Sequence, residues 1–233
     1  MNQFLLALAP LLAANSKDAV AEPRIEVWAG HQVSNGKRKI PLYGEKETHT
    51  ENYFIAEVNR TSSRIDIRQK TCRIDIRPIK GVTPTMKPES IARLPKAHIV
   101  LEEKADGSLV AVPWSTGWES EDVDADGFPG ATVQISGTSC SGDIYVSSQS
   151  VTSLLSGCAT DDGATGEVSL RLRQKILGAK GLCLKLMAGD SDETQTGWLA
   201  YRRVEPGTTC QSLAGKPWPV KAGPPEAART QSR

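Results

Sequence analysis

The sequence predicts an all-β protein, in its simplest form a single antiparallel up-and-down barrel of about ten strands. Apolar and polar side chains alternate through most segments between residues 24 and 204, which is typical of antiparallel strands with one buried face. Turn-forming residues separate these segments at short intervals, as in a chain of hairpins. The sequence has no long amphipathic helical pattern. Two packed sheets forming a sandwich are the alternative fold for the same strands.

The alternation is clearest in the second half of the chain, where every second side chain is apolar in four segments. These segments are residues 132–137, 143–147, 168–173 and 182–187. Further strands are expected at residues 53–58, 98–103 and 109–114. The sequence Ala105-Asp106-Gly107 predicts the turn that joins the last two of these strands.

Residues 64–77 predict a long strand that contains Arg-Ile-Asp-Ile-Arg twice, at 64–68 and 73–77. The two copies are offset by nine residues, so an unbroken strand would turn their isoleucines to opposite faces. One extra bulge residue near 70–72 would restore a common face and bend the strand. Closed barrels require such bent strands. A strand whose end changes faces is the alternative.

Glycine and proline mark the expected turns. The pair Asn35-Gly36 is a strong hairpin signal, and the Gly-Ala-Lys-Gly sequence at 178–181 predicts another turn. Pro88 suits the first position of a short helix, so we expect one or two helical turns over residues 88–94.

The ends of the chain differ from the middle in composition. Residues 4–14 form an apolar run of 11 residues, which is too short to span a bilayer as a helix. With the small-x-small sequence Ala19-Val20-Ala21, this run predicts a signal peptide over residues 1–21; an amphipathic first helix is the alternative. We therefore expect an extracytoplasmic protein, periplasmic or secreted, with a β-barrel domain at 22–214 and a proline-rich flexible tail at 215–233.

All five cysteines follow the predicted signal peptide, and an oxidising compartment favours their pairing. Cys140 and Cys158 bracket a predicted hairpin, so they are the first expected disulfide. Cys183 and Cys210 are the second, which leaves Cys72 unpaired. Other pairings stay open, because spacing alone does not choose among them. No CxxC sequence is present, so the spacing fits no zinc site.

The charge balance limits the classes of partner. A net charge of +1 gives no reason to expect nucleic acid as a partner. Only 5% of the residues are aromatic, whereas barrels that span membranes carry girdles of aromatic residues. We therefore expect a protein without a membrane span, and a monomer.

One motif carries metal chemistry. Asp122, Asp124 and Asp126 stand at alternate positions before Gly127, so three carboxylates in a tight turn can converge on one hard cation. Calcium requires six to eight oxygen ligands, so backbone oxygens, with Phe128 as a candidate, must complete the site. An acidic stretch from 105 to 167 with no Lys or Arg favours a bound cation. A solvated Asp/Gly turn without an ion is the alternative.

This loop resembles the DxDxDG calcium loops of FG-GAP propeller blades and thrombospondin type 3 repeats. The resemblance implies that Asp122, Asp124 and Asp126 ligate calcium. It covers about nine residues and departs from the FG-GAP pattern at Gly130, where those blades usually carry Asp. An EF-hand is excluded, because its twelfth position would be Val133 rather than Glu. As a whole, the chain resembles uncharacterised exported bacterial β-barrel proteins, and its strand number resembles the lipocalin-like class.

The sequence contains no catalytic motif: it has neither HExxH nor GxSxG, and only three histidines. We therefore expect no catalytic residues and a non-enzymatic exported protein, with a small apolar ligand in the barrel and a structural calcium loop. A metal-assisted extracytoplasmic hydrolase is one alternative function. A structural or adhesive surface module is another.

Overall fold

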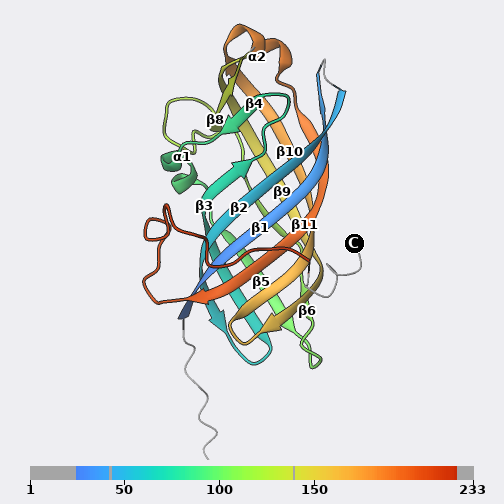
Figure 1. The fold of residues 1–233 in the computed structure, drawn as a ribbon, viewed down its shortest axis with the longest axis vertical. Coiled ribbons are helices and arrows are strands. Elements are labelled where there is room, and N and C mark those ends of the chain that lie inside the picture. The colour runs from blue at the N-terminus through green and yellow to red at the C-terminus, as the bar shows by residue number, and fades with distance from the viewer. Residues whose placement is uncertain (1–24, 42–43, 139, 225–233) are drawn as a thin grey trace, which may run out of the picture.

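The computed structural model describes residues 25–41, 44–138 and 140–224. The predicted signal peptide lies outside these residues. In the described part, a single antiparallel sheet of 11 strands curls around a common interior, which confirms the predicted barrel (Figure 1). The elements are β1 (Ile25–Ile40), β2 (Gly44–Arg60), β3 (Arg64–Ile76), β4 (Val82–Thr85), α1 (Pro88–Arg93), β5 (Ala97–Glu103), β6 (Leu109–Ala111), β7 (Trp114–Trp118), β8 (Ala131–Gly137), β9 (Gly142–Thr160), β10 (Gly163–Lys180), α2 (Leu182–Met187) and β11 (Ser191–Val204).

The first and last strands lie side by side at the centre of the sheet. The strand order is β4-β8-β9-β10-β11-β1-β2-β3-β5-β6, with β7 also paired to β9. One edge of β9 pairs in succession with β8 and β7, and then forms a bridge from Cys158 to Ser108, next to β6. This bridge closes a ring that runs from β9 through β10, β11, β1, β2, β3, β5 and β6 back to β9.

Large apolar side chains fill the end of the barrel near β6. Burial of each such side chain contributes about 1.5–3 kcal/mol, so this end is the main source of stability. The buried cluster consists of Trp28, Phe54, Ala56, Val58, Ile65, Ile67, Ile99, Leu101, Leu109, Trp114, Ala164, Val168, Leu199 and Tyr201.

The predicted bulge in β3 is confirmed. Tyr53 of β2 opposes Arg73, whereas the next residue, Phe54, opposes Thr71. Cys72 is therefore the extra residue. Ile65 and Ile67 are fully buried on the inner face before the bulge. After it, the side chains at 74 and 76 again line the interior.

The turn predicted at Asn35-Gly36 is wrong, because both residues lie inside β1. Gly36 pairs with Thr48 of β2 on one side and with Gln195 of β11 on the other. Pairing on both sides outweighs the local preference for a turn. The missing side chain of Gly36 also makes room, since a Cβ there would lie 2.7 Å from the Cγ of Gln195.

Two other local predictions near the end of β10 are wrong. Residues 178–180 continue β10 as pairs of residues in β9, so the chain turns only at Gly181. The segment 182–187 is the helix α2 rather than a strand. Leu184 is its buried contact, whereas Leu182 is 82% exposed. Alternating apolar and polar residues in a segment of only six residues therefore do not specify a strand. A strand also needs the free edge of a neighbouring strand to pair with. The predicted short helix is confirmed as α1, with Pro88 in its first turn.

The cysteine pairs also differ from the prediction. The disulfides are Cys72–Cys210 and Cys140–Cys183, and Cys158 is free and exposed. Cys140 precedes β9 and Cys158 lies near the end of the same strand, so the extended strand holds them roughly 50 Å apart. The antiparallel pairing of β9 with β10 instead brings the start of β9 to the end of β10, where Cys183 follows. Cys210 pairs with Cys72 at the bulge, because the chain after β11 crosses the outside of the barrel.

Part of the proline-rich tail is packed rather than free. The Trp218 Nε1 donates a hydrogen bond to the Gly30 oxygen at 2.9 Å. Ala222 is also buried. The tail that was expected to be flexible therefore contacts the barrel as far as Ala222, and residues 225–233 lie outside the described range.

We expect one reactive thiol per molecule when the oxidised protein is denatured without reductant. Replacement of Cys158 by Ser should reduce that number to zero. Non-reducing peptide mapping should recover cross-linked peptides that contain Cys72 with Cys210 and Cys140 with Cys183. A peptide linking Cys140 to Cys158 would contradict this arrangement.

Candidate functional site

The half of the barrel near α2 is hollow. It encloses a cavity of about 400 Å³, within the range of about 300–1,000 Å³ that is usual for small-molecule sites. Phe54 and Trp114 belong both to the apolar core and to the cavity lining, so they form its floor. The core below them closes the other end of the barrel.

Aliphatic side chains form most of the cavity wall. Those that alternate in β8, β9 and β10 point inward, as their sequence pattern predicted. The aliphatic lining includes Ile74, Ile76, Ile79, Val82, Val133, Ile135, Ile144, Val146, Leu170, Leu172, Ile176 and Leu184. A ligand with an apolar surface would therefore exchange water for hydrocarbon contacts here.

Polar groups are concentrated on the same cavity. Of the 11 buried polar residues in the described chain, seven line it. They are Gln32, Ser34, Gln69, Ser148, Thr152, Glu193 and Gln195. Buried polar groups need hydrogen-bond partners, so this distribution marks the cavity as the chemically specific part of the barrel.

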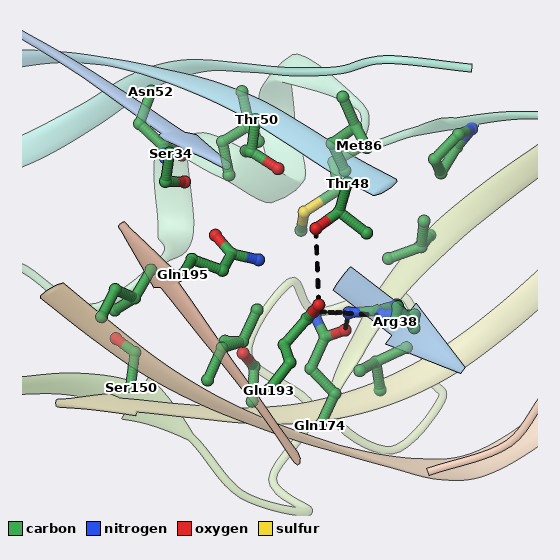
Figure 2. Close-up of a pocket in the computed structure, with 18 of the residues that line it drawn as sticks. Ser34, Arg38, Thr48, Thr50, Asn52, Met86, Ser150, Gln174, Glu193 and Gln195 are labelled. Atoms are coloured by element: carbon green, nitrogen blue, oxygen red, sulfur yellow. Dashed lines mark hydrogen bonds and ion pairs between the residues drawn. The ribbon is translucent and has the colours of Figure 1, made fainter. Parts of the chain in front are cut away.

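The one buried acid in the cavity is neutralised by an arginine (Figure 2). The Arg38 Nη2 lies 2.6 Å from the Glu193 Oε1, and the Arg38 Nε lies 3.1 Å from the same oxygen. The Arg38 Nη2 also donates to the amide oxygen of Gln174. Thr48 donates to the other oxygen of Glu193. This network leaves Glu193 without a free negative charge for a ligand.

The loop between β7 and β8 brings the three predicted aspartates together. Oxygens of Asp122, Asp124 and Asp126 lie within 4.8 Å of one another, so this group could hold a metal ion. The backbone N–H groups of Asp126 and Gly127 donate to the two oxygens of Asp122, at 3.1 and 2.8 Å. These hydrogen bonds lower the pKa of Asp122, and the one from Gly127 has the largest effect. Asp122 therefore stays anionic.

Asp124 is the unusual member of the group, because only 5% of it is exposed. Its Oδ2 accepts the Thr132 backbone N–H at 3.0 Å. Its Oδ1 is buried and has no hydrogen-bond partner among the described residues. A buried carboxylate oxygen without a partner is costly, and a cation would compensate it. Phe128 stacks on Tyr145 with ring centroids 4.4 Å apart, and its role as a backbone ligand stays a prediction.

A third cluster lies on the outer face of β1 and β2, under the C-terminal segment. His31 is 2% exposed, and its Nε2 lies 3.0 Å from a Glu51 oxygen. The His31 Nδ1 accepts the Ala222 backbone N–H at 2.9 Å, so the proton resides on Nε2. Tyr53 stacks on His31 and donates to Glu51 at 2.8 Å. No sequence pattern indicated this cluster, because His31, Glu51 and Ala222 lie far apart in the chain.

Burial lowers the pKa of His31, although the hydrogen bond and charge of Glu51 oppose this effect. The neutral ring is required here, because a protonated Nδ1 could not accept the Ala222 N–H. Within the described residues, no serine or cysteine side chain hydrogen-bonds to His31. The cluster therefore fixes the C-terminal segment and lacks the nucleophile of a catalytic triad.

Comparison with known proteins does not assign a family. The chain matches no protein-family model and no curated protein. Among solved structures, it is similar to DynF from the dynemicin biosynthesis pathway of Micromonospora chersina, with 11% identity and a TM-score of 0.33. That similarity covers 79% of this chain and 83% of DynF. A similarity at this level carries no argument about function. In the described part of the chain, no helix has the length and apolar character needed to cross a bilayer.

We expect acidification from pH 7 to pH 5 to destabilise the protein through His31. The folded pKa is lower than the ordinary value of 6.5, so the unfolded state binds more protons and stability falls as the pH drops below about 6.5. Burial raises the pKa of Glu51, but hydrogen bonds from Tyr53 and the histidines bring it below 4.5. Glu51 therefore stays ionised over this range.

The measurement is the melting temperature against pH for the wild type, His31→Gln and His98→Gln. His98 is an exposed control, because 56% of its side chain is accessible. The pH slope should flatten for His31→Gln alone. An unchanged slope in His31→Gln would contradict the role of His31.

Proposed function

We propose that this protein is an exported, non-enzymatic protein that binds a small molecule in the barrel cavity. The observation that carries the proposal is the hollow half-barrel, with a volume of about 400 Å³ and a mostly aliphatic wall. Cavities of this size and character are the usual sites of small ligands. An empty apolar cavity lowers stability, which favours a function for the space.

Several features support an extracytoplasmic location. Two disulfides are present in the described chain, and such bonds persist in oxidising compartments. The predicted signal peptide at 1–21 agrees with that location, in the periplasm or outside the cell. The balanced charge of the chain argues against nucleic acid as a partner. We propose that the protein acts as a monomer.

The hydrolase alternative has less support. A catalytic metal needs an open coordination position and groups that bind and activate the substrate. The acidic group of the β7–β8 loop contains three aspartates and no histidine among the described residues. A structural ion fits this group better than a catalytic one.

We further propose that the ion is calcium and that its role is to stabilise the β7–β8 loop. The specific observation is the unpartnered Oδ1 of the buried Asp124. A carboxylate has about four acceptor sites, so Asp122 can accept its two backbone N–H groups and still bind a cation. Calcium is the common hard cation that accepts several carboxylates with variable geometry. The ion would fix a loop that joins two strands of the cavity wall. The alternative function is an adhesive surface module that the calcium-bound loop stabilises.

The cavity predicts binding of the neutral apolar fluorophore N-phenyl-1-naphthylamine. Replacement of Ile135 by Trp would fill part of the cavity next to β8. We expect at least about tenfold weaker binding of the fluorophore, because the larger side chain overpacks the cavity and removes contact area. Ser136 lies on the exposed face of the same strand, so Ser136→Trp is the matched control. Fluorescence titration measures both variants. Equal affinity in the two would place the fluorophore outside the cavity.

Calcium should raise the melting temperature, and EDTA should reverse the effect. At a calcium concentration of about 100 times the dissociation constant, we expect an increase of about 5–10 °C. Asp124→Asn should abolish the increase, whereas Asp161→Asn, at an exposed turn, should retain it. If neither calcium nor EDTA changes the melting temperature of the wild type, a structural calcium ion is excluded.

A further inference from the structure

Among the polar side chains inside the cavity, two sets differ in whether they form side-chain hydrogen bonds within the protein. The first set makes its own hydrogen bonds. Thr116 and Ser150 bond to each other at 2.7 Å, and Gln69 accepts the hydroxyl of Tyr201. With the network of Arg38 and Glu193 described above, these residues have hydrogen-bond partners within the protein.

The second set lies together on β1, β2 and β11. It consists of Gln32, Ser34, Thr50, Asn52 and Gln195, all of which line the cavity, and we call it the neutral polar cluster. Its members are neighbours, because Gln32 opposes Asn52 and Ser34 opposes Thr50 across the β1–β2 pairing. Gln195 comes from β11 through the space that Gly36 leaves open. Figure 2 shows Ser34, Thr50, Asn52 and Gln195 around one side of the cavity.

Among the described residues, no side-chain hydrogen bond joins a member of this cluster to the rest of the protein. The Ser34 hydroxyl has no hydrogen-bond partner although the residue is 2% exposed. Gln195, at 3% exposure, makes none of the side-chain hydrogen bonds found among the described residues. Unsatisfied buried polar groups lower stability. The buried Ser34 hydroxyl, beside four polar side chains without side-chain hydrogen bonds on the same wall of the cavity, therefore points to hydrogen bonds with a ligand.

We infer that the ligand is an uncharged amphipathic molecule, with an apolar body and a hydroxyl, carbonyl or amide group that binds the neutral polar cluster. This inference rests on the proposed function and specifies the ligand class. The aliphatic wall accommodates the apolar body. The amides and hydroxyls of the cluster offer both donors and acceptors, which suits a neutral polar group.

The charges around the cavity argue against an ionic ligand. No member of the neutral polar cluster carries a charge, and the buried Glu193 is already paired with Arg38. Lys39 and Lys80 border the cavity but are exposed, so they lie at its mouth rather than beside the cluster. A carboxylate or ammonium group placed against the cluster would lose its hydration without gaining a countercharge.

A matched set of bicyclic compounds tests the inference by displacement of N-phenyl-1-naphthylamine at pH 7. We expect 2-naphthol to bind at least about fivefold more tightly than naphthalene, because it adds one hydrogen bond to the same apolar body. We expect 2-naphthoate to bind at least about tenfold more weakly than 2-naphthol. Equal affinity for naphthol and naphthalene, or a preference for naphthoate, would overturn the inferred ligand class.

Variants locate the selectivity in the cluster. In Ser34→Ala and Gln195→Leu, the preference for 2-naphthol over naphthalene should fall to about twofold or less. Ser136→Ala, which removes an exposed hydroxyl on β8, should keep the wild-type preference. Without ligand, Ser34→Ala should melt at the wild-type temperature or about 1–3 °C higher, because an unsatisfied hydroxyl is removed. A clear decrease would show that the hydroxyl has a structural partner and would overturn its role in binding.

The outcomes separate this inference from the function on which it rests. If the fluorophore and all three compounds fail to bind, the proposed ligand-binding function is wrong and the inference is wrong with it. If the fluorophore binds in the cavity but the naphthol preference is absent, the ligand-binding function stands and the inferred ligand class is wrong.

Discussion

The pairing of β1 with β11 organises both faces of the barrel wall. Ten residue pairs join the first strand to the last, and this pairing converts two runs of hairpins into one ring. Its register brings Gln195 opposite Gly36, next to the position of Ser34. Beyond the last of these pairs, it brings Arg38 to within 2.6 Å of Glu193. A shift of one residue would turn each of these side chains to the other face, so the cavity chemistry depends on this register.

The same strand also holds the C-terminal segment, because neighbouring residues of β1 face opposite sides of the wall. His31 faces outward and accepts the Ala222 N–H, whereas Gln32 faces the cavity. The backbone oxygen of Gly30 accepts the indole N–H of Trp218. The Cys72–Cys210 disulfide anchors the start of this segment at the β3 bulge. The outer covering of the barrel is thus attached by a covalent bond at one end and by hydrogen bonds to β1 at the other.

The sequence predicted features that depend on local periodicity and missed those that depend on distant partners. The odd offset between the two Arg-Ile-Asp-Ile-Arg copies predicted a bulge near residues 70–72, because the inner face must stay apolar along one strand, and the structure has it at Cys72. The spacing of Asp122, Asp124 and Asp126 likewise located the acidic group. By contrast, Asn35-Gly36 is a turn sequence that two neighbouring strands hold extended. The disulfide partners and the contact of His31 with Glu51 depend on which strands meet, and the residue pattern does not contain that information.

The cavity itself follows from the distribution of side-chain size around the ring. Four aromatic side chains, those of Trp28, Phe54, Trp114 and Tyr201, join the buried cluster at one end. At the other end, many of the inward side chains are Ile, Val, Ser and Thr, which are too short to meet across the interior of an eight-stranded ring. The low aromatic content therefore implies a void as well as an aliphatic core, a consequence that periodicity does not show. A void and unpaired polar groups both lower stability. Ligand binding therefore explains why the protein keeps polar side chains on the wall of a cavity better than a role in folding does.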